Sequence, residues 1–491
     1  MPELPNILFL FPDQLRRDFL SCYGAEFIDT PNIDSIAGRG VRYDRAYSAS
    51  PLCVPARTAL MTGMNAIRNG VSDNLHALRP DYNEAGIQTW PQLLSDAGYY
   101  TSAVGKMHFY PWDALHGFQY RVVCEDKLWT NIRDDYHHYL TEHGRKKMPW
   151  DRYGDYLEKK GAATTDVPWE HSWDRYTGRE ACRFIDNYGG DGPFAMMVGF
   201  PGPHDPYDPA VDFSERFNPE DMPDPVPAAD DDPGSLRATH IEARRNMGMD
   251  LEQFTTEEKK TIRAHYAGLV KQIDHEVGEI IDSLRSRGLL ENTVIIFSTD
   301  HGDYLGDHGL DGKAAFFEAA THIPLLVSLP GGLQGSVNSD LVELRDVTAT
   351  ILKIAGCEQP RYMDAQILPD LGFQEPPART RIFGMLTQGW MVFDGEWKLC
   401  QYSLDGPMLF NLKDDPDELI NLVKDPAYGD VFRRLSAELT KEMMQSIVLS
   451  MHDRLVAPYS LSSEDRMGRE GWQWKFPADA SEATKVGVDY Y

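Results

Sequence analysis

Short apolar runs alternate with helical patterns through roughly the first 360 residues of the chain. Continuous apolar runs bounded by turn residues indicate buried strands. They are Ile7–Phe11, Tyr99–Val104, Phe194–Phe200, Val294–Ser298 and Pro324–Ser328. Apolar residues at steps of three and four from Tyr266 to Leu284 predict a long helix that ends near Gly288. This alternation is typical of an α/β fold in which helices flank a mostly parallel central sheet.

The pattern changes after Pro376-Pro377. Short alternating runs there indicate antiparallel strands, and Asp394-Gly395 supplies a turn signal between two of them. The runs are Arg381–Leu386, Trp390–Asp394, Trp397–Tyr402 and Pro407–Asn411. A helical pattern from about Val431 to Ile447 follows. We therefore expect a smaller C-terminal α+β domain, an antiparallel sheet plus a helix, over residues 378–458.

The expected α/β domain spans residues 1–377 and carries two insertions, at about 120–180 and 205–260. The first insertion has no clean periodicity, and the second contains the Pro- and Asp-rich stretch Phe217–Pro233, which indicates a surface excursion. Four tryptophans are candidates either to line a pocket or to belong to the core: Trp112, Trp129, Trp150 and Trp169. The remaining tail, residues 459–491, either wraps a neighbouring subunit of a homo-oligomer or packs on its own chain.

The composition limits which binding partners and which cellular compartment are expected for the protein. The 48 Lys and Arg residues against 76 Asp and Glu residues give a net charge of −28, which argues against nucleic acid and anionic membranes as partners. The six cysteines form no CxxC pair and are too few for a disulfide framework. The N-terminus lacks a cationic leader, and its five-residue apolar run is far below the ~20 residues that cross a bilayer. We expect a cytoplasmic protein that contacts neither nucleic acid nor membrane.

Polar side chains follow the carboxyl ends of four predicted strands. They are Asp13 and Gln14, Lys106 and His108, His204, and Asp300 and His301. Taken singly, each has an ordinary explanation, because Asp favours turns, His is often a surface or core residue, and Lys is usually solvated. In open α/β sheets, however, ligands bind beyond the carboxyl ends of the strands. The shared position therefore predicts one crevice that suits a divalent metal beside an anion.

The segment from Ser50 to Gly63 adds a candidate nucleophile. Pro55 suits a first helical turn and Gly63 a helix end, so Cys53 is expected at a helix N-terminus. Unpaired N–H groups and the helix dipole favour an anion or a lowered thiol pKa there. Arg57, one turn further, faces the same side of the helix. The alternative is a buried structural cysteine with Arg57 on the surface.

These motifs resemble those of the type I sulfatases, which belong to the alkaline phosphatase superfamily. Leu52–Arg57 matches their C-x-P-x-R signature, in which a maturation enzyme oxidises the cysteine to formylglycine. Three further segments are similar to family motifs: Gly105–His108, Thr299–Gly302 with Lys313, and Leu409–Leu412 before Asp414-Asp415-Pro416. The resemblance implies an alkaline-phosphatase-like α/β fold with a smaller C-terminal antiparallel sheet.

The resemblance also implies a sulfuric ester hydrolase that cleaves a small-molecule or saccharide sulfate ester to alcohol and sulfate. Formylglycine at position 53, hydrated to a diol, would attack sulfur, and one divalent metal would activate the attacking hydroxyl. The implied metal ligands are Asp13, Gln14, Cys53 in its oxidised form, Asp300 and His301. The implied catalytic residues are Cys53 as nucleophile, Arg57 holding the diol, Lys106 and Lys313 facing the sulfuryl oxygens, His204 as proton donor to the leaving oxygen, and His108 as base.

Two departures from the usual sulfatase pattern leave more than one metal and more than one class of ester substrate open. Asp13-Gln14 replaces Asp-Asp and Asp300-His301 replaces Asp-Asn, as in branches similar to choline sulfatases and phosphonate monoester hydrolases. The family favours Ca²⁺, whereas an imidazole ligand favours Mn²⁺, and Mg²⁺ is a third candidate. The same nucleophile would also serve a phosphonate or phosphate mono- or diester hydrolase, although Lys106 and His108 favour sulfate. An inactive binding protein that keeps the fold is the remaining alternative.

Overall fold

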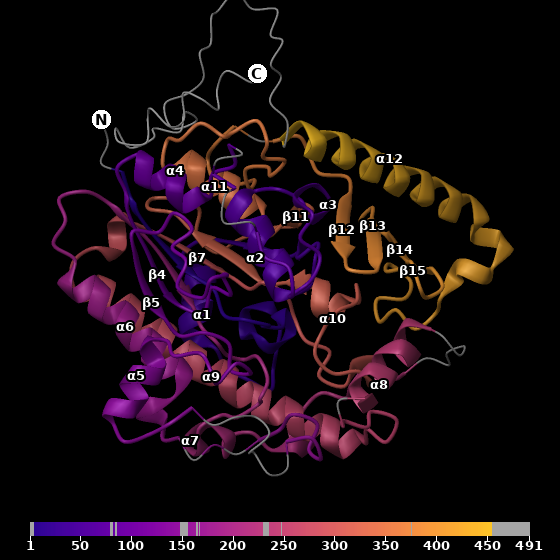
Figure 1. Ribbon diagram of the computed structural model, residues 1–491, viewed down its shortest axis with the longest axis horizontal. Coiled ribbons are helices and arrows are strands. Elements are labelled where there is room, and N and C mark those ends of the chain that lie inside the picture. Colours follow the sequence, from indigo (N-terminus) through magenta and orange to yellow (C-terminus); the bar gives the residue numbers. More distant parts are fainter. Residues whose placement is uncertain are drawn as a thin grey trace, which may run out of the picture. The chain divides into compact units, whose positions relative to one another are not determined.

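The computed structural model describes residues 4–453 except 79–81, 84–85, 148–155, 164, 166, 229–234, 247 and 375 (Figure 1). Its main sheet has the strand order β10-β2-β9-β7-β1-β6-β4-β5. The bounds are β1 Asn6–Leu10, β2 Val41–Tyr43, β4 Tyr100–Gly105, β5 Tyr120–Val123, β6 Phe194–Gly199, β7 Thr293–Ser298, β9 Leu325–Ser328 and β10 Ser336–Asn338. The neighbouring strands β7, β1, β6, β4 and β5 are all parallel.

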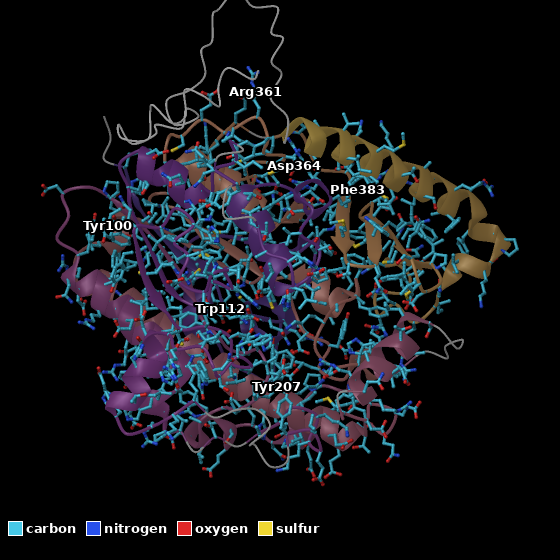
Figure 2. All side chains as sticks on the ribbon, in the orientation of Figure 1. Tyr100, Trp112, Tyr207, Arg361, Asp364 and Phe383 are labelled. Carbon is cyan, nitrogen blue, oxygen red and sulfur yellow. The ribbon has the colours of Figure 1, made fainter. Side chains whose placement is uncertain are left out.

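The sheet separates two apolar cores, which side chains fill on either face (Figure 2). Alternate residues of β1 enter different cores, Leu8 the first and Phe9 the second. The first core is covered by α1 (Pro31–Gly38), α6 (Trp173–Asn187) and α9 (Thr256–Ser286), and the second by α2 (Cys53–Thr62), α4 (Trp90–Asp96) and α11 (Asp346–Ile354). Because both faces are buried, the central strands are continuous apolar runs in the sequence.

The structure confirms the expected α/β architecture. Each of the five strands predicted in the first part of the chain is present, with ends within one residue of those expected. The long helix is α9, and its apolar stripe from Tyr266 to Leu284 is buried. The fifth of these strands, β9, runs antiparallel to β7, so the sheet is mixed but mostly parallel.

A separate antiparallel sheet forms the C-terminal part of the described chain, as predicted. It runs β12 (Ile382–Leu386), β13 (Gly389–Phe393), β14 (Trp397–Tyr402) and β15 (Met408–Asn411). The following helix α12 (Gly429–Asp453) buries Leu435 and Leu439 against this sheet. The domain limits at 377 and 458 remain predictions, and the tail 459–491 lies outside the described residues.

Several elements were not predicted. The edge strand β5 lies in the segment expected to be an insertion, and α5 (Asp135–Glu142) and α6 follow it. A third, small sheet joins β11 (Val342–Glu343), β3 (Ala46–Tyr47) and β8 (His322–Ile323). The other helices are α3 (Ala66–Asn69), α7 (Val211–Ser214), α8 (Leu236–Asn246) and α10 (Glu318–Thr321). Within the described residues, none of the helices combines the length and the apolar character needed to span a bilayer.

Replacing Ile273 with Ala should lower the free energy of unfolding by about 2–5 kcal/mol, because the side chain is fully buried where α9 meets the sheet. Chemical denaturation monitored by circular dichroism measures the change. The matched control is Arg285→Ala on the same helix, since Arg285 is exposed and its ion pair with Asp282 contributes little. Equal shifts for the two variants would contradict the placement of the apolar stripe of α9.

Candidate active site

The predicted polar residues lie at one edge of the sheet, where four parallel strands end. β7, β1, β6 and β4 are consecutive neighbours, so the segments that follow them start side by side. The N–H of Asp13, after β1, donates to the carbonyl of Phe200 after β6 (3.0 Å), and the N–H of Gln14 donates to Asp300 Oδ1 after β7 (2.9 Å). The carboxyl-end rule therefore brings the predicted site residues together here.

A buried guanidinium joins these segments. Arg57 is only 2% exposed, and its Nη2 and Nε contact Asp13 Oδ2 (2.7 Å) and Asp300 Oδ2 (2.9 Å). Its third contact is from Nη1 to the carbonyl of Lys106 (2.9 Å). The alternative that placed Arg57 on the surface is wrong.

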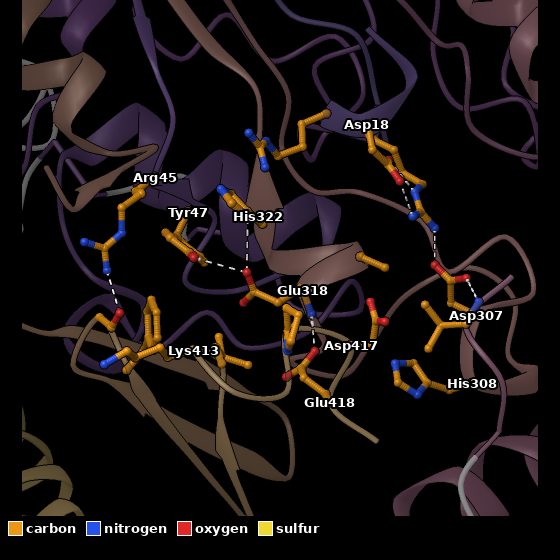
Figure 3. Close-up of a pocket in the computed structure, with 18 residues that line it drawn as sticks. Asp18, Arg45, Tyr47, Asp307, His308, Glu318, His322, Lys413, Asp417 and Glu418 are labelled. Atoms are coloured by element: carbon orange, nitrogen blue, oxygen red, sulfur yellow. Dashed lines mark hydrogen bonds and ion pairs between the residues drawn. The ribbon is translucent and has the colours of Figure 1, made fainter. Parts of the chain in front are cut away.

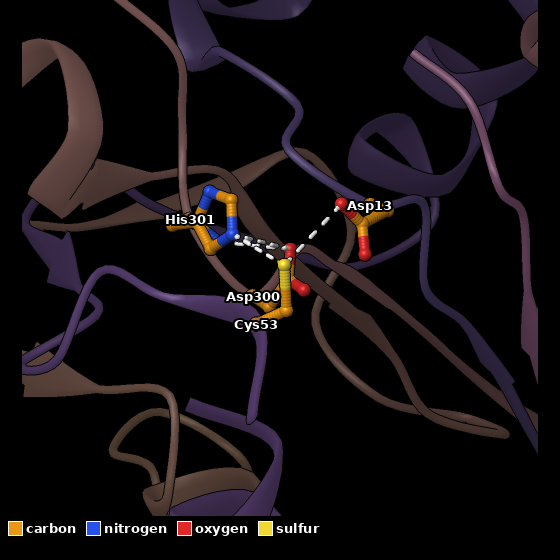
Figure 4. A group of neighbouring side chains, drawn as sticks. All are labelled: Asp13, Cys53, Asp300 and His301. Carbon is orange, nitrogen blue, oxygen red and sulfur yellow. Dashed lines mark hydrogen bonds and ion pairs between the residues drawn. The ribbon is translucent and has the colours of Figure 1, made fainter. Parts of the chain in front are cut away.

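Cys53 is the first residue of α2, as its spacing from Pro55 and Gly63 predicted. Its Sγ lies 3.3 Å from His301 Nε2 and 4.0 Å from Asp13 Oδ1. One ligand atom from each of Asp13, Cys53, Asp300 and His301 lies within 4.8 Å of the others, and all four residues are buried. Figure 4 shows these four side chains directed at a common point.

The surrounding charges favour an anion at position 53. Burial alone would raise the pKa of the Cys53 thiol, but Lys313, Lys106 and His301 outweigh it and hold that pKa well below its usual range. Burial and Cys53 likewise raise the pKa of Asp13, whereas Lys106 and Arg57 lower it further, so the Asp13 carboxylate stays ionised. An oxyanion at position 53 would experience the same field.

Lys106 is completely buried at the end of β4. Its Nζ lies 3.0 Å from Asp13 Oδ2 and 2.5 Å from Asp126 Oδ2. Gly105 has φ +91°, and a Cβ there would stand 2.1 Å from the carbonyl oxygen of Gly199. Glycine is therefore required where the chain turns Lys106 into the site.

Lys313 and His204 form a pair on another side of the cluster. Lys313 Nζ donates to His204 Nε2 (2.7 Å) and to Gln14 Oε1, and His204 Nδ1 donates to the carbonyl of Asp205 (2.6 Å). Burial and Lys313 lower the pKa of His204, but Asp205 and Asp126 more than offset them, so that pKa is raised. The neighbouring carboxylates therefore favour the protonated form of the His204 imidazole.

His108 completes the predicted set. The Nδ1 atom of its ring lies 3.9 Å from Asp126 Oδ2, and its backbone N–H donates to Glu125 Oε2 (3.1 Å). The ring stacks on Trp112, with 5.6 Å between centroids, and Trp129 lies 6.5 Å from Trp112 and is half exposed. Two of the four candidate tryptophans therefore stand beside the cluster.

Of the other two candidate tryptophans, Trp169 has no contact with this cluster in the described structure. Trp169 packs on Phe213 at 4.6 Å between centroids, and Trp150 lies outside the described residues.

Sequence reasoning missed the carboxylates that support the cluster. Asp126 follows the unpredicted strand β5, and Asp303 accepts hydrogen bonds from Gln14 Nε2 and from the hydroxyl of Tyr207 (2.6 Å). Asp205 accepts a hydrogen bond from the hydroxyl of Tyr156 (2.6 Å). The acidic pair Glu125-Asp126 after the apolar residues Val122-Val123 was an available signal, because it repeats the pattern of polar residues after a strand.

The donor set fits a divalent cation. Asp13 uses Oδ2 for Arg57 and Lys106, which leaves Oδ1 directed at the cluster. His301 Nδ1 donates to the carbonyl of Gly302 (2.9 Å), so Nε2 is the ring nitrogen that faces Cys53 and that would bind a cation in its deprotonated form, the usual arrangement of a metal-binding histidine. Metal–ligand distances of about 2.0–2.6 Å allow ligand atoms up to about 5 Å apart, so the observed separations are compatible.

A separate cavity of about 490 Å³ is lined by residues of the C-terminal sheet region and by residues that precede it in the chain (Figure 3). No predicted site residue is among its described lining residues. Several of its polar groups contact one another or the backbone, as Arg45 donates to the carbonyl of Gly395 (2.7 Å) and Tyr47 to Glu318 Oε2 (3.1 Å). We therefore locate the candidate site at the strand ends and not in this cavity.

Comparisons with known proteins agree with the geometry. The family model described as "Sulfatase" matches residues 5–357, and the model described as "N-sulphoglucosamine sulphohydrolase, C-terminal" matches residues 306–445. Together the two matches run from β1 through most of α12.

Individual relatives cover nearly the whole chain. An arylsulfatase of Clostridium perfringens is 29% identical over 89% of this chain and 94% of its own, and a choline-sulfatase of Rhizobium meliloti is 31% identical over 86% and 83%. The crystal structure of a phosphonate monoester hydrolase of Agrobacterium radiobacter has the same fold, with a TM-score of 0.74, 22% identity, and coverage of 91% of this chain and 96% of its own. The chain therefore belongs to the sulfatase family, within the alkaline-phosphatase-like superfamily, and is a hydrolase of sulfate esters.

Proposed function

We propose that this sulfatase cleaves a sulfate monoester with residue 53, oxidised from cysteine to formylglycine, as its nucleophile. The observation that carries the proposal is the position of Cys53, buried at the N-terminus of α2 against Asp13, Asp300 and His301. A side chain placed there meets two carboxylates, an imidazole and two ammonium groups, which suits attack by an oxyanion on an anionic ester.

One divalent cation, held by Asp13, Gln14, Asp300, His301 and the oxidised side chain of residue 53, would supply Lewis acidity and a lowered pKa for the attacking hydroxyl. Arg57 keeps the two carboxylates in place through its contacts of 2.7 and 2.9 Å. Lys106 and Lys313 supply positive charge where the sulfuryl oxygens would lie. The family favours Ca²⁺, and the imidazole of His301 makes Mn²⁺ the next candidate, before Mg²⁺.

His204 is the proposed acid for the leaving oxygen. In the free site Lys313 donates to His204 Nε2, so this nitrogen accepts. A bound sulfate ester would attract the Lys313 ammonium, and the Nε2 atom would then be available to hold and donate a proton. Nδ1 stays fixed by the carbonyl of Asp205 and preserves the orientation of the ring. His108, beside residue 53, is the proposed base for release of sulfate.

The substrate is proposed to be a small-molecule or saccharide sulfate ester. Trp112 and Trp129, beside His108, offer an apolar wall to the alcohol part. A phosphonate or phosphate ester hydrolase with the same nucleophile is the second candidate, favoured by Gln14 and compatible with the shared fold of the phosphonate monoester hydrolase. Lys106 supplies a positive charge and His108 a proton acceptor. Both side chains favour a sulfate over a phosphonate ester as the substrate.

We further propose a cytoplasmic location. All six cysteines belong to the described part of the chain and none of them is in a disulfide, which suits a reducing compartment. Conversion of Cys53 would require a formylglycine-generating enzyme as a partner. Association of copies through the tail 459–491 remains a proposal from the sequence.

Replacing Cys53 with Ala should lower the rate of sulfate release by a factor on the order of 10³ or more, because alanine cannot be oxidised to the nucleophile. The circular dichroism spectrum and the content of bound divalent metal should stay close to those of the unaltered protein. Cys182→Ala, at a half-buried cysteine outside the cluster, is the matched control and should keep full activity. Turnover by Cys53→Ala at the unaltered rate would exclude this nucleophile.

Replacing His204 with Ala should reduce hydrolysis of alkyl sulfates much more than that of nitrophenyl sulfate, because a good leaving group needs no proton. Steady-state rates with paired substrates measure the difference. His265→Ala is the control, since His265 Nδ1 also faces a backbone carbonyl (Tyr207, 2.9 Å) but lies outside the cluster. Equal losses for both substrates would argue against His204 as the acid.

Removing divalent metal with a chelator should abolish sulfate release without unfolding the protein, because many contacts besides the metal hold the strand ends together. Metal analysis and rates after adding back Ca²⁺, Mn²⁺ or Mg²⁺ separately check this. We expect Ca²⁺ to restore the rate. Full activity in protein shown to be free of metal would refute the metal-dependent account.

A further inference from the structure

The segment after β5 runs beside the segment after β4 and contacts it through two residues, Glu125 and Asp126. Gly105 pairs with Val123 in the parallel register of these strands. Beyond them, the carboxylate of Glu125 accepts the backbone N–H groups of Met107 (3.2 Å) and His108 (3.1 Å). Glu125 therefore fixes the backbone that carries His108, which has φ +57°.

The next residue, Asp126, reaches the side chains on that backbone. Its Oδ1 accepts the N–H of Leu128 (2.8 Å), which fixes the carboxylate plane and directs Oδ2 at the site. Oδ2 lies 2.5 Å from Lys106 Nζ and 3.9 Å from His108 Nδ1. Asp126 is 2% exposed, so water does not screen these interactions.

Lys106 and His108 depend on Asp126 to different degrees. Lys106 has a second carboxylate partner, Asp13, at 3.0 Å. The Nδ1 atom of His108 is buried and makes no hydrogen bond with any described residue. A buried donor without a partner is costly, and Asp126 Oδ2 is the carboxylate oxygen that faces it. A ring movement of about 1 Å would bring the two atoms to hydrogen-bond distance, and such contacts often tighten only when substrate binds.

We propose that Asp126 is a positioning residue, which orients His108 as the base that releases sulfate from residue 53. This inference rests on the proposed function. In that step His108 takes the proton of the free hydroxyl on residue 53. The electron pair of that O–H bond forms the carbonyl, the bond from carbon to the sulfate oxygen breaks, and sulfate leaves with its electrons. Asp126 keeps the Nδ1 proton in place and balances the charge that the imidazole gains, while also holding Lys106.

The test compares Asp126→Asn with Glu418→Gln in the matured enzyme. Glu418 is the matched control, because it is also buried and paired with a lysine (Lys398, 2.5 Å) but contacts none of Lys106, His108 and Glu125 in the described structure. Nitrophenol release from nitrophenyl sulfate is followed through the first turnover and into the steady state. Acid-quenched enzyme is then digested, and the peptide with residue 53 is examined for bound sulfate by mass spectrometry.

Asp126→Asn should release about one nitrophenol per active site in a burst, followed by a steady state about 10- to 100-fold slower than that of the unaltered enzyme. KM should not rise, and sulfate should accumulate on residue 53. Glu418→Gln should show neither effect. Asp126→Ser serves as a second variant if the first does not fold.

A folded Asp126 variant without burst and without sulfated peptide would overturn the assignment, since loss of Lys106 support alone slows the first step. Equal behaviour of the Asp126 and Glu418 variants would overturn it too. If the unaltered, matured enzyme releases no sulfate from any ester, the proposed function itself fails, which is a distinct outcome.

Discussion

The contact of Arg57 with Asp13 and Asp300 is the interaction on which the site depends. These two carboxylates come from the ends of β1 and β7, and both are completely buried. Two unpaired buried carboxylates would cost several kcal/mol each, or would become protonated. The guanidinium makes them stable as anions, and it comes from the same helix as Cys53. A single residue therefore ties the nucleophile's helix to the two strands that bear the candidate metal ligands.

The strand order then determines what surrounds that centre. β6 lies next to β1 in the sheet and β4 lies next to β6, so their carboxyl ends add His204 and Lys106 to the cluster that contains Asp13. The segment after the edge strand β5 adds Asp126, which gives Lys106 a second counter-charge besides Asp13. The cluster thus combines carboxylates and ammonium groups with three imidazoles, those of His108, His204 and His301. Such an arrangement can receive a cation and an anionic ester together without a large change in net charge.

The sequence alone predicted the central strands and the polar residues that follow them. It did not predict the third sheet, the edge strand β5 or Asp126. Buried parallel strands are apolar throughout, so β1, β4, β6 and β7 were found, and the polar residues after them marked the site. The third sheet was missed because β3, β8 and β11 are two residues long and owe their pairing to tertiary contacts. β5 was missed because it is a short edge strand with an exposed Tyr120 and a polar Arg121, which leaves little periodicity. Asp126 could not be assigned without β5, since only the register of β5 with β4 places it beside Lys106.

The most direct test of the central claim is the chemical state of residue 53 in active protein. Batches matured to different extents would be digested, the peptide containing residue 53 would be weighed for replacement of the thiol by an aldehyde, and sulfate release would be measured on the same batches. The account predicts that the rate rises in proportion to the aldehyde fraction and extrapolates to zero at none. Full turnover by protein in which residue 53 is entirely unmodified cysteine would contradict it.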